Sequence, residues 1–127
     1  MEKNQDILKY YREELKWDPP FADVLSRYSP DALEGYFTMR KSVQDGELPR
    51  KIVELIFTIL DALDDEASGA KAHAVASIEA GLTVKELVEA FNIVTMVKGI
   101  NVLCKTGINA IKAAEERYNE ISEGMLR

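Results

Sequence analysis

The stretch from Ile52 to Leu63, IVELIFTILDAL, constrains the fold more than any other part of the sequence. Every residue in it is apolar except Glu54, Thr58 and Asp61. Because apolar residues cover most of the helical surface, this stretch predicts a helix that its neighbours enclose. Together with Asp65, the polar residues recur every three or four positions, which places them in one narrow stripe. Such a stripe meets either a strip of water or an internal polar cavity.

The following stretch, 67–80, is rich in alanine, glycine and serine. Small side chains predict a helix that a partner helix can approach closely. His73, the only histidine in the chain, lies here and shares a helical face with Glu66 and Gly69. Because so little bulk surrounds the imidazole, this face leaves room for a small ligand.

Start and stop signals divide the chain into helices. Proline, glycine and cap residues mark the helix ends: Pro19–Pro20, Ser29–Pro30, Asp45–Gly46, Pro49, Gly81 and Gly99. Ser29 is expected to cap a helix that runs from Pro30 to about Val43. Thr83 and Glu86 are expected to form a capping box. No segment shows the sustained alternation of a strand, so the sequence predicts an all-α fold of six or seven helices.

The 127 residues predict a single domain, 1–127, which is long enough to bury a core without disulfides. Helices within about 1–46 are expected to cover a core of about 48–122. The first helix carries an apolar face, made of Ile7, Leu8, Tyr11 and Leu15. The aromatic residues near the N-terminus are expected to pack together or to contact another subunit: Tyr10, Tyr11, Trp17, Phe21 and Tyr28.

Charge and cysteine content exclude several classes of protein. A net charge of -6 argues against a nucleic-acid partner, because phosphate binding needs a clustered basic surface. The sequence shows no signal peptide and no run of ~20 apolar residues, so we expect no membrane partner. Cys104, the single cysteine, excludes an internal disulfide and favours a cytoplasmic location. We expect it to be a buried, inert thiol on the terminal helix.

Four elements of the sequence occur in a familiar order: a helix with one glutamate, an acidic break, a small-residue helix with a histidine, and Gly-x-Thr-x-x-Glu at 81–86. This pattern resembles the carboxymuconolactone decarboxylase family, which includes the alkylhydroperoxidase D-like proteins. The resemblance covers Leu48 to about Lys98. It implies an orthogonal, alkylhydroperoxidase D-like helical bundle that assembles as a homo-oligomer, namely a dimer, trimer or hexamer.

The peroxidase branch of this family carries a glutamate, then a Cys-x-x-Cys pair, then a histidine. Glu54 and His73 stand at the spacing of that glutamate and histidine, whereas the cysteine positions fall on Glu66 and Gly69. Peroxide reduction needs one thiolate to attack and a second thiol to resolve the sulfenic acid. A peroxidase activity is therefore disfavoured, and the decarboxylase branch fits better.

The resemblance suggests a cofactor-independent lyase that acts on a small carboxylated, lactone or aromatic-derived compound. Such an enzyme stabilises an enolate-like charge and returns a proton to carbon, which requires no metal or organic cofactor. His73 is the expected proton donor or enolate stabiliser, and Glu54 is expected to orient the imidazole. Glu66 receives the lesser role of general acid. The substrate carboxylate would pair with one of four basic side chains: Arg50, Lys51, Lys71 or Lys98.

Structural explanations compete with these catalytic roles. Glu54 could mark the wet edge of a core helix, and His73 could be a hydrogen-bonded structural histidine. Glu66 fits a first-turn acid that complements the helix dipole. The acids between 61 and 66 lack the spacing of a calcium loop, so we expect a solvated acid patch and no metal site. A non-catalytic binding or assembly protein is therefore the alternative function.

Overall fold

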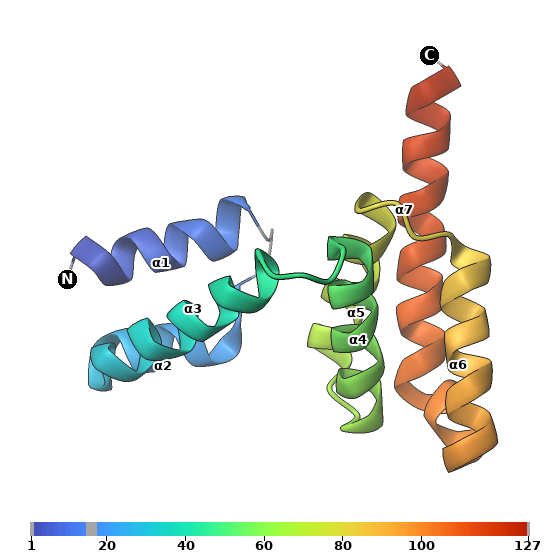
Figure 1. Cartoon of the computed structure of the whole chain (residues 1–127), viewed down its shortest axis with the longest axis horizontal. Helices are drawn as coiled ribbons and strands as arrows, with labels where there is room; N and C mark the ends of the chain where they lie inside the picture. Colours follow the sequence, from blue (N-terminus) through green and yellow to red (C-terminus); the bar gives the residue numbers. More distant parts are fainter. Residues whose placement is uncertain (1, 15–17, 127) are drawn as a thin grey trace. The chain divides into compact units, whose positions relative to one another are not determined.

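The computed structural model describes residues 2–14 and 18–126. This part of the chain contains helices and no strand (Figure 1), which confirms the predicted all-α class. The elements are α1 (Glu2–Glu13), α2 (Pro20–Tyr28), α3 (Pro30–Gln44), α4 (Arg50–Leu63), α5 (Ala67–Glu79), α6 (Val84–Lys98), the π-helical η1 (Leu103–Gly107) and α7 (Ile108–Leu126). No helix among the described residues is long and apolar enough to cross a membrane.

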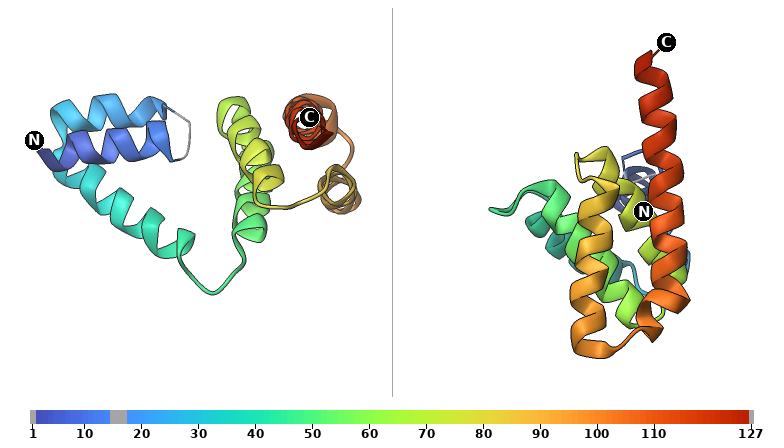
Figure 2. Two further views of the ribbon diagram at one scale, coloured as in Figure 1. Left: turned by 90° about the horizontal axis from the view of Figure 1, so that it is seen from above. Right: turned by 90° about the vertical axis from the view of Figure 1, so that its right-hand side faces the viewer.

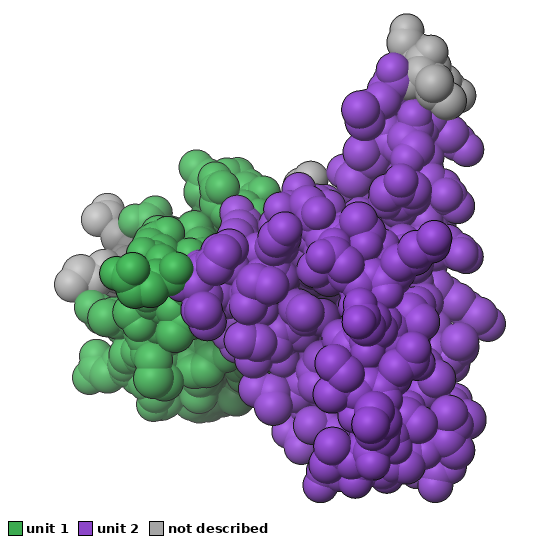
Figure 3. All heavy atoms as spheres, turned by 45° about the vertical axis from the view of Figure 1, so that its right-hand side comes forward, with its two compact units in different colours: residues 1–47 green, residues 48–127 purple. Residues whose placement is uncertain are grey.

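The chain divides into two compact units, Met1–Glu47 and Leu48–Arg127, which Figure 3 colours separately. The first unit contains α1, α2 and α3, and its core is formed by Ile7, Tyr11, Ala22 and Leu33. Tyr11 packs edge-to-face against Phe21, as the sequence predicts for these aromatic residues. Burial of Tyr11 raises the pKa of its hydroxyl to about 12. Tyr28 instead is exposed, while Leu15 and Trp17 lie outside the described residues.

The second unit is built around α5, which packs against α4 and α7 (Figures 1 and 2). Ala70 and Ala74 on α5 are completely buried. These small side chains allow the close helix approach that the sequence predicts. On α6, Leu87 and Phe91 complete the core between these helices.

The central helix α4 differs from the enclosed helix that its composition predicts. Its buried face contains Val53, Glu54, Thr58 and Ala62, so two members of the polar stripe point into the protein. Large apolar side chains are exposed instead, with Ile56 at 44%, Leu60 at 54% and Leu63 at 37% of their full accessibility. The reason is that α5 covers only the face of α4 that carries Glu54 and Thr58.

Glycine and cap residues end the helices largely where the sequence predicts. Gly81 has a φ of +107°, and the amides of Gly81 and Leu82 donate to the carbonyls of Ile78 and Ser77. This is the Schellman arrangement that closes a helix C-terminus. Gly99, with a φ of +87°, ends α6. Ser29 occupies the N-cap position of α3, but its side chain makes no capping hydrogen bond.

The capping box at the start of α6 yields a test of local stability. The amide of Glu86 donates to the Thr83 hydroxyl, and the amide of Thr83 donates to the Glu86 carboxylate. Thr83→Ala removes one of these bonds and should lower the free energy of unfolding by about 1 kcal/mol in urea denaturation. Thr95→Ala is the matched control, because its hydroxyl lies within the same helix and bonds to the Phe91 carbonyl. Equal losses in the two variants would contradict the capping role.

Candidate functional site

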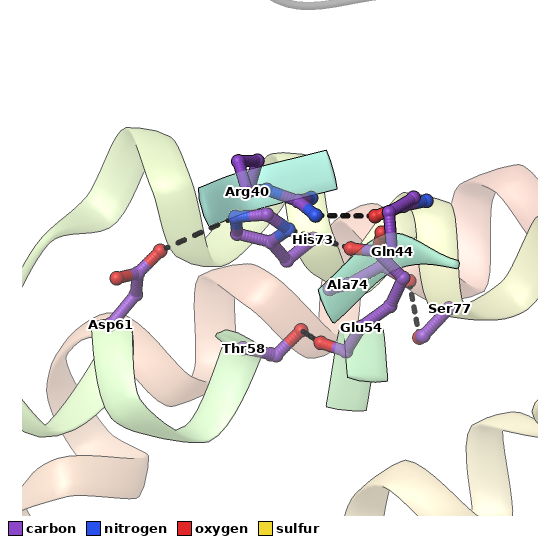
Figure 4. Close-up of polar contacts among 8 residues, drawn as sticks. All are labelled: Arg40, Gln44, Glu54, Thr58, Asp61, His73, Ala74 and Ser77. Carbon is purple, nitrogen blue, oxygen red and sulfur yellow. Dashed lines mark hydrogen bonds and ion pairs between the residues drawn. The ribbon is translucent and has the colours of Figure 1, made fainter. Parts of the chain in front are cut away.

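A buried hydrogen bond between Glu54 and His73 joins α4 to α5 (Figure 4). Oε2 of Glu54 lies 2.6 Å from Nδ1 of His73. Glu54 is completely buried and His73 is only 8% exposed. Burying a carboxylate costs free energy of desolvation unless a hydrogen-bond donor meets it, and His73 supplies that donor. Because a carboxylate accepts hydrogen bonds, Nδ1 is the donor and carries a proton.

Neighbouring side chains make their own contacts and fix the imidazole plane. The Thr58 hydroxyl donates to the backbone carbonyl of Glu54, and the Ser77 hydroxyl donates to the carbonyl of Ala74. Phe57, on α4, stacks on His73 with ring centroids 4.6 Å apart and an angle of 17° between the planes. The imidazole is therefore held in both position and orientation.

The second ring nitrogen of His73 faces Asp61, also on α4 (Figure 4). The distance from Nε2 to Oδ2 of Asp61 is 3.9 Å, which is too long for a direct hydrogen bond but suits a bridging water or a ligand atom. The Asp61 side chain is 29% exposed, whereas that of Glu54 is 1% exposed. The imidazole thus lies between one carboxylate that is dry and one that reaches solvent.

The pKa of Asp61 is raised above its ordinary value, mainly because burial penalises the charged carboxylate. A positive charge on His73 opposes this shift, and the acids Glu66 and Asp64 reinforce it. Asp61 therefore keeps its proton to a higher pH than a solvated aspartate.

The structure places the other predicted site residues away from the imidazole or leaves them unassigned. Glu66 is exposed and precedes α5 as its N-cap residue, so it is not the first-turn acid that the sequence predicts. Among the described residues, no hydrogen bond or ion pair joins Glu66 to His73. The basic candidates for carboxylate binding lie mostly on the surface, with Arg50, Lys71 and Lys98 exposed and Lys51 half-buried. The geometry selects none of them.

Asp61 is not among the site residues that the sequence predicts, although a signal for it exists. Asp61 follows Glu54 by seven residues, and a helix brings residues seven apart to the same face. Asp61 therefore belongs to the predicted polar stripe, although the sequence predicts that it is part of a solvated acid patch. The described residues contain no group of three or more His, Cys, Asp or Glu side chains arranged to hold a metal ion.

The prediction for Cys104 is wrong. This thiol is exposed and lies in η1, where the backbone of Lys105 departs from helical geometry. The side chain of the following Thr106 is instead buried and donates to the carboxylate of Asp65. Cys104 and Thr106 thus point to opposite sides of η1, as residues two apart on a helix do.

The first unit contains a separate open hollow of about 400 Å³. Its walls come from α1 and α3 and are formed by Asp6, Ile7, Tyr10, Glu34, Phe37 and Thr38. None of the residues predicted to be functional lies in this hollow.

Comparison with known proteins shows which family this chain belongs to. No protein-family model and no curated protein matches the sequence. Among solved structures, the fold is similar to that of a protein from Burkholderia xenovorans LB400 described as a "putative carboxymuconolactone decarboxylase". The TM-score is 0.83 with 32% sequence identity, over 95% of this chain and 98% of that one. The chain belongs to the carboxymuconolactone decarboxylase family. This confirms the predicted family and fold, and extends the similarity well beyond Leu48 to Lys98.

The raised pKa of Asp61 makes the stability of this family member depend on pH. Folded Asp61 binds its proton more tightly than unfolded Asp61, so its contribution to stability is present at low pH and is lost as pH rises above the ordinary value of 3.8. Asp61→Asn mimics the protonated form. In urea denaturation at several pH values, this variant should gain stability relative to the parent protein as pH rises.

Glu86 provides a control of opposite sign. Its pKa is lowered by hydrogen bonds from the backbone and side chain of Thr83. Its stabilising effect is therefore present above the ordinary value of 4.5 and is lost as pH falls. Glu86→Gln should lose stability relative to the parent at neutral pH but not in acid. The same pH trend in both variants would refute the assignment of the Asp61 shift.

Proposed function

We propose that this protein is a cofactor-independent carboxy-lyase that acts on a small carboxylated compound, either a lactone acid or an aromatic-derived acid. The observation that carries this proposal is the buried contact of 2.6 Å between Glu54 and Nδ1 of His73. A histidine held by a carboxylate on one nitrogen is a common arrangement for proton transfer at the other. Family membership agrees with this chemistry, and the exposed single thiol fits a reducing cytoplasm.

The proton transfer would occur at Nε2 of His73. Glu54 accepts the hydrogen bond that Nδ1–H donates, which holds the ring so that the proton on Nε2 is left for the substrate. In the proposed reaction, the bond between carbon and the substrate carboxylate breaks and carbon dioxide leaves. The electron pair moves onto a conjugated carbonyl, and the Nε2 proton then adds to carbon. A proton that comes ultimately from solvent restores His73, so the cycle balances without a co-reactant.

We also propose that the protein assembles as a homo-oligomer through α6. Three large apolar side chains on this helix are exposed, and their spacing of three and four residues from the first places them in one stripe: Ile93 (59%), Met96 (85%) and Val97 (75%). A contiguous apolar stripe of this kind is typical of a protein interface. A second copy would also supply part of the cover that the exposed apolar residues of α4 lack.

Replacing the imidazole tests the catalytic proposal. His73→Gln should lower the turnover of carboxymuconolactone, followed by release of carbon dioxide, by about 100-fold or more while the helical circular dichroism is kept. Lys112→Gln, an exposed change on α7, is the control and should retain full turnover. Unchanged turnover in His73→Gln would refute the role of His73. A parent protein with no activity on any lactone acid would favour the binding or assembly alternative.

A charge on the α6 stripe tests the assembly proposal. Met96→Lys should shift the molar mass measured by light scattering from that of an oligomer to that of a monomer, because a buried lysine must be desolvated. Met125→Lys is the matched control, since Met125 is 83% exposed but lies on α7, outside the stripe. A parent protein that is monomeric at micromolar concentration would disprove the proposed assembly.

A further inference from the structure

Gly69 on α5 faces the carboxylate of Asp61 on α4 at a distance that only glycine permits. A Cβ atom placed on Gly69 would lie 2.3 Å from Oδ2 and 3.1 Å from Cγ of Asp61. Real contacts of a Cβ atom are essentially never as short as the first distance. Any side chain at position 69 would therefore push the Asp61 carboxyl away from its observed place.

The backbone of Gly69 gives no other reason for a glycine. Gly69 lies within the helix α5, and the positive φ angles of the described glycines occur only at Gly81 and Gly99. A helical glycine is less stable than alanine, so this position carries a cost that helix formation does not explain. The space it leaves is occupied by the Asp61 carboxyl, whose Oδ2 lies 3.9 Å from Nε2 of His73.

We infer that Asp61 is a positioning residue that returns a proton to Nε2 of His73. Gly69, which has no side chain, leaves the space that the Asp61 carboxyl occupies beside the ring. This inference rests on the proposed function for the identity of the proton acceptor, which is the substrate carbon. After Nε2 has given up its proton, the Asp61 carboxyl donates one through a bridging water. Asp61 then takes a proton from solvent, so the step balances.

The surroundings of Asp61 suit this role. Its side chain is 29% exposed, so it reaches solvent, whereas Glu54 on the other side of the ring does not. Burial raises the pKa of Asp61, and the nearby acids Glu66 and Asp64 add to this shift against the opposing charge of His73. Asp61 is therefore protonated over a wider range of pH than a solvated aspartate, as a proton-returning group requires.

The sole histidine allows a test that does not depend on activity. The ring ¹⁵N signals of His73 can be followed by NMR against pH in the full chain, without ambiguity of assignment. We expect these signals to respond to the titration of Asp61 in the parent protein. The response should vanish in Asp61→Asn and shrink in Gly69→Ala. It should persist in Gly124→Ala, where an added Cβ meets no atom within 4 Å. Identical curves in all four proteins would overturn the inference.

A second measurement separates proton return from proximity. With carboxymuconolactone as the probe, Asp61→Ala should lose roughly tenfold or more of kcat with little change in KM, and added formate should restore part of kcat. A kcat equal to that of the parent, or no rescue by formate, would overturn the proton-return role. If the parent protein turns over no lactone, the proposed function fails, and the NMR comparison alone decides whether Asp61 and Gly69 act on His73.

Discussion

The second unit depends on the pairing of one buried carboxylate with one imidazole. Glu54 has no access to water, so the folded chain must bring a hydrogen-bond donor to it. His73 supplies that donor from α5, and this requirement sets which faces of α4 and α5 meet. The alanines of α5 allow the two backbones to approach closely enough for the side chains of Glu54 and His73 to form a hydrogen bond. The hydrogen bond between Glu54 and His73 therefore both fixes the packing of α4 against α5 and forms the centre of the candidate site.

This requirement also explains why α4 buries Glu54 and Thr58 and leaves several apolar residues exposed. A helix of this composition would ordinarily turn its apolar residues inward. Here the face with Glu54 and Thr58 is buried against α5, and Ile56 and Leu60 are left exposed. A buried polar site and an exposed apolar surface are thus two results of one rotation of the helix about its axis.

Gly69 connects the site to the chemistry of the wider family. The resemblance places the second cysteine of the peroxidase branch at this position, where the present chain has no side chain at all. The Asp61 carboxyl fills the resulting space beside His73. A thiol at position 69 and a carboxyl at this place exclude each other sterically. In this chain the space that a side chain at position 69 would need is therefore occupied by a carboxyl group next to the imidazole.

The sequence by itself determined the helices, because capping residues, glycines and apolar spacing act over a few neighbouring positions. It also predicted the family and singled out Glu54 and His73, which stand at a recognisable spacing. Only the tertiary structure decided which face of α4 is buried, that Asp61 rather than Glu66 approaches His73, and that Cys104 is exposed. These features depend on how one helix is rotated against its neighbours. Contacts between residues far apart in the chain set this rotation, so the spacing of residues along the sequence does not by itself decide it.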